Sequence, residues 1–360
     1  MKYVDEFRDS RLIKKEAALI RSAVDRKWRF MEVCGTHTMS IFRFGLRQIL
    51  PDDIELLSGP GCPVCVTPNG YLDKAIAIAG EKNVIMTTFG DMLRVPGSRS
   101  TLEIQKASGC DIRTVYSTTD ALDIAGRNPS KEIVFLGVGF ETTVPTVARS
   151  IMIAKKEGIK NYSVLSAHKT MPEALGSLAG SDLKVDGFIL PGHVSAITGT
   201  APYRFLAKTY KKRCVVSGFE PLDILQSILV LIKQKSPKVE IQYKRIASSG
   251  GNPKARACIY KVFQKCDSVW RGIGKVKDSG LEIKKCYADF DAEVKFHPRP
   301  APPKENKNCR CGDVLKGLIP PVECKLFGKT CTPQHPVGAC MVSSEGACAA
   351  YYKYRGDRFE

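Results

Sequence analysis

The chain has 360 residues, of which 43% are hydrophobic, so it can bury more than one large core and does not depend on disulfide bonds to fold. Its 55 basic and 37 acidic residues give a net charge of +18, but the basic residues are spread along the chain without the interleaved aromatic residues of nucleic-acid binders. The charge therefore argues against a nucleic-acid partner and favours an acidic protein partner or a solvated basic face.

The first 30 residues predict a charged, amphipathic helix without the apolar region of a signal peptide. The longest apolar stretch, residues 227–232, is too short to cross a bilayer. We therefore expect a cytoplasmic protein with no membrane segment. Its cysteines are then kept reduced, and clustered cysteines in that compartment bind metal or do redox work.

Eight short apolar or β-branched runs, each followed by a helical stretch, predict parallel strands with crossover helices. They lie at 30–33, 54–57, 84–88, 113–116, 133–138, 162–166, 187–190 and 214–217. The predicted fold class is α/β, with two tandem parallel-sheet lobes, 29–128 and 129–235, facing a cleft. Segment 126–132, which contains Gly, Asn and Pro, marks their boundary. Beyond residue 236 the pattern changes to a helix, two or more strands, a Pro-rich linker and a cysteine-rich tail.

Polar side chains follow most of these strands. Ligands of open α/β sheets bind beyond the carboxyl ends of the strands, so these side chains predict a site in the cleft between the lobes. The residues concerned are Cys34, Cys62, Cys65, Asp91 and Arg94 in the first lobe and Glu141, His168, His193, Glu220 and Asp223 in the second. Both histidines are equally compatible with a structural role.

Fourteen cysteines fall mainly into two groups at opposite ends of the chain. In the first group, Cys62 and Cys65 form a C-x-x-C motif in a rigid Gly- and Pro-rich turn, and Cys34 ends a neighbouring strand. His37, three residues after Cys34, is placed to ligate a metal, donate a proton or orient a ligand. Metal binding, dithiol redox chemistry and a purely structural role all remain open for this group.

Six more cysteines lie between residues 309 and 348. Four of them, Cys311, Cys324, Cys331 and Cys348, are separated by twelve, six and sixteen residues, which is not the spacing of a zinc finger. Iron–sulfur clusters tolerate such irregular spacing, although zinc also accepts four thiolates. Cys309 and Cys340 exceed the need of one cluster and are candidates for a redox-active disulfide beside it.

Seven long motifs resemble the hydrogenase maturation factor HypD family. They occur in the family's order across nearly the full length: MEVCGTHT, GPGCPVC, TFGDMLRVPG, GFETTVPT, PGHVS, GFEPLD and MVSSEGACAAYYKY. The resemblance implies a scaffold for the active-site iron of NiFe hydrogenases. That iron carries two cyanides and one carbon monoxide, and the scaffold works with the chaperone HypC and with HypE, which delivers cyanide.

The resemblance also implies roles for individual cysteines. Cys34 matches the essential cysteine of the first motif, and Cys62 and Cys65 match the C-x-x-C of the second; these three are the expected ligands of the iron under construction. Cys311, Cys324, Cys331 and Cys348 match the ligands of a 4Fe-4S cluster, and Cys309 and Cys340 resemble a further pair beside it. We expect residues 1–28 and 236–360 to form a third domain around that cluster.

Three polar residues complete the expected site. Asp91 and His37 are expected to orient or protonate the diatomic ligands in the cleft, and Glu345, inside the tail motif, is expected near the same cleft. On its own, the protein is expected to be a monomer.

Two rival functions remain. A cluster-linked dithiol oxidoreductase would use the same cysteines to reduce a disulfide of a partner protein and would bind no additional iron. A nucleotide-dependent enzyme, including one that turns over ATP in a complex with HypC, would bind phosphate at the glycine-ended strands; GVGFETT lacks the third glycine of a dinucleotide fingerprint, so its signal is weak.

Overall fold

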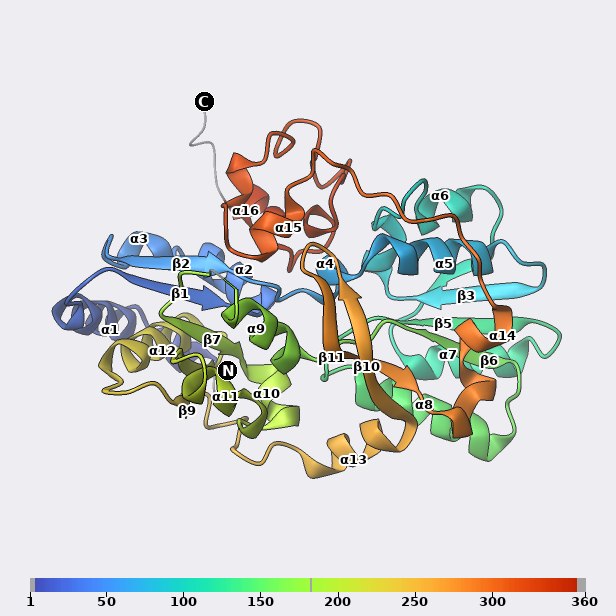
Figure 1. Cartoon of the computed structure of the whole chain (residues 1–360), viewed down its shortest axis with the longest axis horizontal. Helices are drawn as coiled ribbons and strands as arrows, with labels where there is room; N and C mark the ends of the chain where they lie inside the picture. The colour runs from blue at the N-terminus through green and yellow to red at the C-terminus, as the bar shows by residue number, and fades with distance from the viewer. Residues whose placement is uncertain (1–3, 182, 355–360) are drawn as a thin grey trace.

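Two parallel β-sheets form the body of the molecule (Figure 1). The computed structural model describes residues 4–181 and 183–354. The first sheet has the order β2 (Ile54–Ser58), β1 (Trp28–Glu32), β7 (Gly187–Pro191), β8 (Arg213–Ser217), β9 (Val239–Ile241). The second has the order β4 (Ile112–Thr114), β3 (Val84–Thr88), β5 (Glu132–Gly137), β6 (Tyr162–Ser166). Each of the eight predicted strands is present, and the α/β class is confirmed.

The strands are not grouped as the sequence analysis expected. We predicted four consecutive strands in each lobe, 29–128 and 129–235. In the structure, β1 and β2 belong to the first sheet, the next four strands form the whole second sheet, and β7, β8 and β9 complete the first sheet. Strand β1 pairs with β7 through Phe30 and Gly187, residues that are far apart in the sequence. Because all eight strands are short and apolar, their local pattern does not specify which of them pair.

Helices cover both sheets and make the crossovers. Those on or beside the first sheet are α1 (Ser10–Ala23), α2 (Gly35–Arg43), α3 (Leu46–Ile49), α9 (Met171–Ala179), α10 (Gly192–Thr198), α11 (Arg204–Lys208) and α12 (Pro221–Lys233), with the short η1 (Asp5–Phe7) and η3 (Ala201–Tyr203). Those on or beside the second are α5 (Asn69–Ala79), α6 (Leu102–Ala107), α7 (Thr118–Arg127), α8 (Val144–Glu157), α13 (Pro253–Val262) and α14 (Ala292–Phe296), with η2 (Gly90–Arg94) and η4 (Lys285–Phe290). None of the helices in the described part of the chain is long and apolar enough to cross a membrane.

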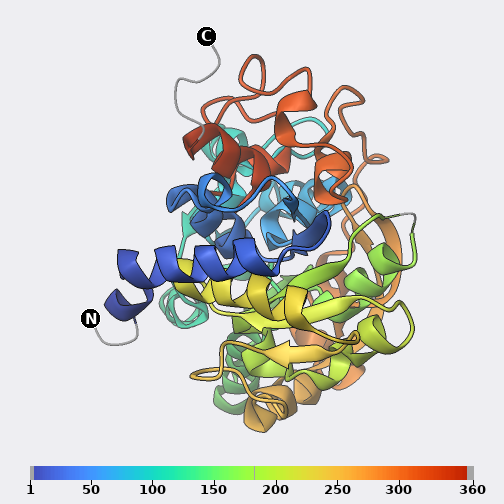
Figure 2. The same ribbon diagram turned by 90° about the vertical axis from the view of Figure 1, so that its left-hand side faces the viewer.

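Helix α1 packs beside α12 on the outside of the first sheet (Figure 2). Asp9 caps its amino end by accepting hydrogen bonds from the backbone N–H groups of Arg11 and Leu12. The apolar stripe of α1 places Ile20 in a core with Trp28 and Ile224. We expected the N-terminal helix in a third domain, but it packs against α12 and shares the core of the first sheet.

Strands of the two sheets point toward each other, so their carboxyl ends meet in the middle of the molecule (Figure 1). An antiparallel hairpin of β10 (Phe263–Trp270) and β11 (Gly274–Ile283) lies at this junction. Its turn is tied to α4 (Pro63–Val66) by a hydrogen bond from the backbone N–H of Arg271 to the carbonyl of Val66. The meeting of strand ends predicted from the sequence is thus present, although different strands make it.

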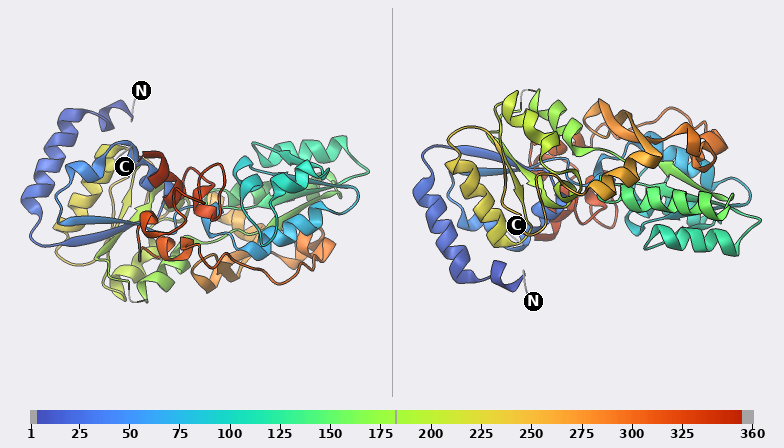
Figure 3. Two further views of the ribbon diagram at one scale, coloured as in Figure 1. Left: turned by 90° about the horizontal axis from the view of Figure 1, so that it is seen from above. Right: turned by 90° about the horizontal axis from the view of Figure 1, so that it is seen from below.

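The cysteine-rich tail lies over this junction, between the two sheets (Figure 3). It consists of loops and four short elements: α15 (Cys311–Leu315), η5 (Pro321–Glu323), η6 (Ala339–Met341) and α16 (Ala347–Tyr354). Its buried residues Val314, Leu315 and Met341 share a core with Met31 and Phe188 of the first sheet. A separate third domain is therefore not confirmed, because the tail shares its apolar core with the first sheet.

Candidate functional site

Cys34 stands at the carboxyl end of β1, where it is the residue before the first turn of α2. The strand ends there because Gly35 begins the helix, and the N–H groups of His37 and Thr38 bond to the carbonyl of Cys34. Cys34 is partly exposed. Burial, and next the negative charge of Glu345, raise the pKa of Cys34 to about 11.

Cys62 and Cys65 lie on the adjoining loop after β2, at the two ends of one helical turn in α4. The sulfur of Cys62 accepts a hydrogen bond from the backbone N–H of Cys65 at 3.3 Å, and both side chains are buried. Gly61 is in direct contact with the backbone of Cys34, because a Cβ at position 61 would lie 2.4 Å from the carbonyl carbon of Cys34. The absence of a side chain at Gly61 permits this close approach of the two loops that carry the front cysteines.

The tail meets these front cysteines at two points. Thr36 donates a hydrogen bond to the Oε1 of Glu345 at 2.8 Å, and a Cβ at Gly35 would lie 2.4 Å from the backbone oxygen of Glu345. Glu345 thus contacts the two residues that follow Cys34. At the second point, the sulfur of Cys65 lies 3.9 Å from the carbonyl oxygen of Ala339, the residue before Cys340, and burial raises the pKa of Cys65 well above its ordinary value. Residues from opposite ends of the chain therefore form one site.

All six tail cysteines line a single small cavity. Five of them are buried, and Cys309 is the one that is partly exposed. The other residues of the wall are mainly apolar, among them Leu326 and Phe327. Within the described residues, no three His, Cys, Asp or Glu side chains are placed to hold one metal ion.

The closest contact in this cavity is between the sulfur atoms of Cys311 and Cys340, which are 2.6 Å apart. The neighbouring Cys348 and Cys65 also influence the pKa of Cys340, and Cys311 influences that of Cys309. The sulfurs in contact are thus those of Cys311 and Cys340, and the expected pair of Cys309 and Cys340 stays a prediction. Cys340 instead lies between the tail cysteines and the C-x-x-C motif.

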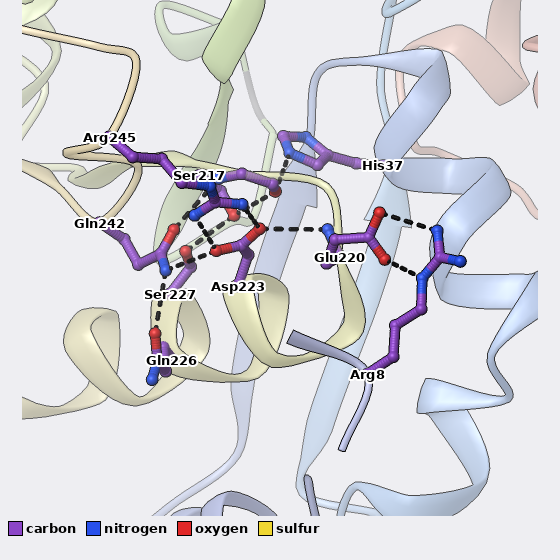
Figure 4. A network of polar contacts seen from close by, with 10 residues as sticks. Arg8, His37, Ser217, Glu220, Asp223, Gln226, Ser227, Gln242 and Arg245 are labelled. Carbon is purple, nitrogen blue, oxygen red and sulfur yellow. Dashed lines mark hydrogen bonds and ion pairs between the residues drawn. The ribbon is translucent and has the colours of Figure 1, made fainter. Parts of the chain in front are cut away.

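His37 occupies a different position from the one expected for a group that protonates a ligand. Its ring is fully buried, and the Nε2 atom donates to the carbonyl of Gly218 at 2.9 Å (Figure 4). The ring also stacks on Phe219, with 4.6 Å between centroids, and burial lowers the pKa of His37 to about 4. A neutral, enclosed imidazole holds α2 against the loop after β8 and cannot supply a proton near neutral pH.

Asp91 lies on η2, after β3, and its side chain is exposed. The contact between η2 and the tail comes from Arg94, which donates a hydrogen bond to the carbonyl of Pro333 at 2.9 Å. The expected role of Asp91 at the diatomic ligands thus has no support from its surroundings.

Known proteins resemble this chain along its whole length. A sequence model named HypD, with the description Hydrogenase formation hypA family, matches residues 11–355. The hydrogenase maturation factor HypD of Rhodobacter capsulatus is 47% identical over 374 residues, which cover 99% of each chain. HypD of Escherichia coli is 45% identical over 374 residues and 100% of each chain, and HypD2 of Bradyrhizobium diazoefficiens is 46% identical over 368 residues, 98% of this chain and 97% of that protein. This chain belongs to the HypD family.

The HypD-family motifs recognised in the sequence gather at the junction of the two sheets and the tail. Cys34 and Glu345 come from the first and last motifs and are neighbours. Phe219, from the GFEPLD motif, is stacked between His37 and His193, whose ring centroids lie 4.6 and 4.2 Å from its own. Family membership, predicted from these motifs, is confirmed.

Two buried charged groups of this HypD-family chain were missed in the sequence. Glu32 is fully buried at the end of β1, where Ser58 and Thr38 donate to its Oε1, and burial raises the pKa of Glu32 to about 7. Lys169 is 2% exposed and donates to Ser268 and Val269, and burial lowers the pKa of Lys169 to about 7. Glu32 could have been recognised in the sequence as a buried charge, because it is the only charged residue in the otherwise apolar strand segment FMEV.

Replacing Glu141, the acidic residue of the GFETT motif, by glutamine is expected to favour the folded state increasingly as pH rises. Burial raises the pKa of Glu141 from 4.5 to about 8, and its Oε1 accepts a hydrogen bond from the N–H of Met171. Between these pH values the folded chain holds a proton that the unfolded chain has lost. The stability that Glu141 contributes is thus complete below about pH 4.5 and is lost as pH rises through about 8.

Glutamine cannot ionise, so the free energy of unfolding of the variant relative to the native chain should rise by more than about 1 kcal/mol from about pH 5 to about pH 8.5. Urea unfolding at a series of pH values measures this difference. The exposed Glu103 on α6 is the matched control, for which glutamine should leave the pH dependence unchanged. A constant difference between Glu141→Gln and the native chain would contradict the prediction.

Proposed function

We propose that this protein is a maturation factor of NiFe hydrogenases and holds an iron carrying two cyanides and one carbon monoxide while that unit is built. The observation that carries the proposal is the contact between the two groups of cysteines. Gly61 joins the backbone of Cys34 to the C-x-x-C loop, and Cys340 joins Cys65 to the tail cavity. Assembly of such an iron unit needs soft ligands and reducing equivalents, and thiols on these adjoining segments can supply both.

In this proposal, Cys34, Cys62 and Cys65 supply thiolate ligands to the substrate iron. Cyanide and carbon monoxide keep Fe(II) in its low-spin state, and thiolates complete its coordination. Because Cys34 is protonated at neutral pH, iron binding must release that proton, so affinity for iron rises with pH. Glu345, which lies beside Cys34, is our candidate for the group that accepts it.

We propose that the tail cavity is the seat of a 4Fe-4S cluster. Its wall offers six thiols among apolar side chains, and a cluster needs one thiolate on each of four irons rather than four ligands converging on one ion. We propose Cys311, Cys324, Cys331 and Cys348 as the four ligands, with Cys309 and Cys340 beside them. When bound, the cluster would supply electrons one at a time.

In this proposal, Cys340 is the thiol through which electrons pass from the tail to Cys65. A disulfide between Cys62 and Cys65 takes up two electrons and two protons and yields two thiols. Both sulfurs are buried, and burial raises the pKa of Cys65, so the reduced Cys65 remains protonated until a metal displaces the proton. Reduction of the pair would thus prepare ligands for the incoming iron.

The partners proposed for this function are HypC, as the protein that shares the iron, and HypE, as a transient donor of cyanide. We further propose that the protein acts in the cytoplasm, is a monomer outside these complexes and binds no nucleic acid. The naming of the relatives as hydrogenase maturation factors supports this assignment.

An anaerobic infrared spectrum with metal analysis tests the proposal. The native chain is expected to show absorptions of bound cyanide and carbon monoxide and about five irons per chain. Replacing Cys34 by alanine should abolish the infrared bands and leave about four irons. Cys286→Ala removes an exposed cysteine far from the site in sequence and should change neither result. Persistence of the bands in Cys34→Ala would show that Cys34 is not a ligand of the iron unit.

The contact between Cys65 and Cys340 also favours a second function, a cluster-linked dithiol oxidoreductase. Such an enzyme would reduce a partner's disulfide through Cys62 and Cys65 and would hold about four irons and no diatomic ligands. Four irons and no cyanide band in the native chain, together with reduction of a disulfide substrate, would favour this alternative.

A further inference from the structure

Cys309 opens onto a polar cavity on the outer side of the tail. It is the one partly exposed member of the six tail cysteines. The cavity has a volume of about 500 Å³ and is also lined by Cys311, Asn69, Arg271 and Lys304. Cys309 and Cys311 line both this cavity and the cavity of the proposed cluster, so the two adjoin.

The mouth of the cavity is basic. Arg99, Lys304, Lys307 and Arg310 are exposed on the segments that form it, and the carboxylates there are Glu305, Asp313 and Asp73, which accepts hydrogen bonds from Ser98. Asp313 is already paired with Arg310. Among residues 4–181 and 183–354, no ion pair is formed by Arg99, Lys304 or Lys307. These three exposed positive charges are thus not held in ion pairs within the described part of the chain.

Arg271 adds a fixed positive charge to the cavity wall. Its side chain is 7% exposed, its Nε donates to the carbonyl of Thr67 at 2.7 Å, and its Nη2 donates to the carbonyl of Pro96 at 3.3 Å. Both acceptors are neutral, so the guanidinium retains its charge without a carboxylate partner in the described structure. A guanidinium in this position favours a negatively charged group at the mouth.

We propose that an acidic, one-electron carrier protein docks on this basic mouth and passes electrons inward at Cys309. The inference rests on the proposed function, because it takes the tail cavity as the seat of a redox cluster. Each reduced carrier gives up one electron and leaves oxidised, and two such deliveries with two protons convert a Cys62–Cys65 disulfide into two thiols. Complementary charge makes a protein partner of this kind fit, because steering by opposite charge accelerates encounter.

The first test measures binding and needs no cluster. Isothermal titration follows the association of an oxidised plant-type [2Fe-2S] ferredoxin, an acidic protein, with the full chain at low ionic strength. The double variant Lys304→Glu/Lys307→Glu is expected to bind at least about tenfold more weakly. Lys14→Glu/Lys15→Glu, which makes the same change in net charge on the exposed face of α1, should bind like the native chain. Equal affinity in the native and Lys304/Lys307 chains, or no binding by the native chain, would overturn the inference.

The second test measures electron delivery to the anaerobic protein with its cluster. In stopped-flow experiments, reduced ferredoxin should reduce the Lys304/Lys307 variant at least about tenfold more slowly than the native chain, and added salt should slow the native reaction. Dithionite, which needs no docking surface, should reduce both at one rate. Equal rates of reduction by ferredoxin in the native and Lys304/Lys307 chains would refute the docking site. A native chain that binds ferredoxin but holds no cluster would refute the proposed function and leave the docking site intact. Binding of inorganic phosphate that depends on Arg271, without any binding of ferredoxin, would replace the proposal by a small-anion site.

Discussion

Replacing Gly61 by alanine is expected to separate Cys34 from the C-x-x-C loop and to abolish retention of the iron unit. The new methyl group would lie 2.4 Å from the carbonyl carbon of Cys34 and 2.4 Å from the backbone nitrogen of Gly35. Both atoms belong to the backbone at the start of α2, so no side-chain rotation can relieve the overlap. One of the two loops must move, which would change the separation between Cys34 and the C-x-x-C cysteines that we propose as ligands.

Forced insertion of a methyl group into packed structure costs about 1–3 kcal/mol. If the same free energy is lost from iron binding, the affinity for iron falls tenfold for each 1.4 kcal/mol, approximately. Iron analysis and the intensity of the cyanide and carbon monoxide bands measure the effect, with a thermal melt to record stability. The expected result is loss of more than about nine-tenths of the bands in a protein that still folds.

Gly126→Ala is the matched control for this change. Gly126 is exposed in α7, its φ is not positive, and a Cβ there would meet no atom within 4 Å. Alanine should therefore be neutral or stabilise the helix by about 0.5–1 kcal/mol. Full retention of the iron unit in Gly61→Ala would mean that the contact between the two loops is not needed for the site.

Replacing Arg245 by methionine is expected to lower the free energy of unfolding by about 3–5 kcal/mol, because it leaves a buried carboxylate without its counter-ion. The guanidinium of Arg245 holds Asp223 with two hydrogen bonds, Nη1 to Oδ1 at 2.8 Å and Nη2 to Oδ2 at 2.6 Å (Figure 4). The side chain of Asp223 is fully buried, and that of Arg245 is 18% exposed. Gln242 and the N–H of Glu220 also donate to Asp223, so loss of Arg245 would weaken a network rather than a single pair.

Arg113→Met removes the same chemical pair from the surface and serves as the control. Arg113 binds Asp111 at 2.8 and 2.7 Å, but the two side chains are 40% and 42% exposed. Water and salt screen this pair, so its loss should cost about 0–1 kcal/mol. Urea unfolding measures both variants, and Asp223→Asn combined with Arg245→Met should recover part of the loss because the amide carries no charge. Similar losses in the free energy of unfolding for Arg245→Met and Arg113→Met would contradict the prediction that burial of the ion pair sets the cost.

The Asp223 network also bears on the cysteine site. Asp223 accepts a hydrogen bond from Gln242, whose Oε1 accepts from the N–H of Gly218, and the carbonyl of Gly218 holds His37 on α2. Arg245→Met should therefore loosen the helix that begins at Cys34 as well as destabilise the chain. Faster hydrogen exchange in residues 35–43 would reveal this connection.

Much of the fold was predictable because its signals are local. The strands are short apolar runs, such as Val84–Thr88, and the helices between them carry one apolar face, so each element could be placed without tertiary information. The expectation that strand ends would carry the polar site was also sound, since Cys34 and Cys62 both follow strands. Pairing was not predictable, because β1 pairs with β7 and not with β3, through contacts between residues nearly half the chain length apart.

The candidate site was predictable in its residue types and not in its geometry. The residue type and spacing of the C-x-x-C motif and of the tail cysteines indicate thiol chemistry. Burial of His37 under Phe219 and exposure of Asp91 arise from packing of the loops after β8 and β3, to which their local sequence gives no clue. The same holds for Cys340, whose neighbours Cys65 and Cys311 come from a distant loop and a short helix.

Two groups of cysteines, the α/β class and membership of the HypD family were determined by the sequence alone, because each depends on residue identity, spacing or local periodicity. The tertiary structure decided that the two groups meet. Gly61 lets the loops of Cys34 and Cys62 touch, the tail packs into the core of the first sheet, and Cys340 thereby reaches Cys65. The physical reason is that apolar burial, which is not directional, draws the tail onto the sheet, while close backbone contacts at a few positions decide which thiols become neighbours.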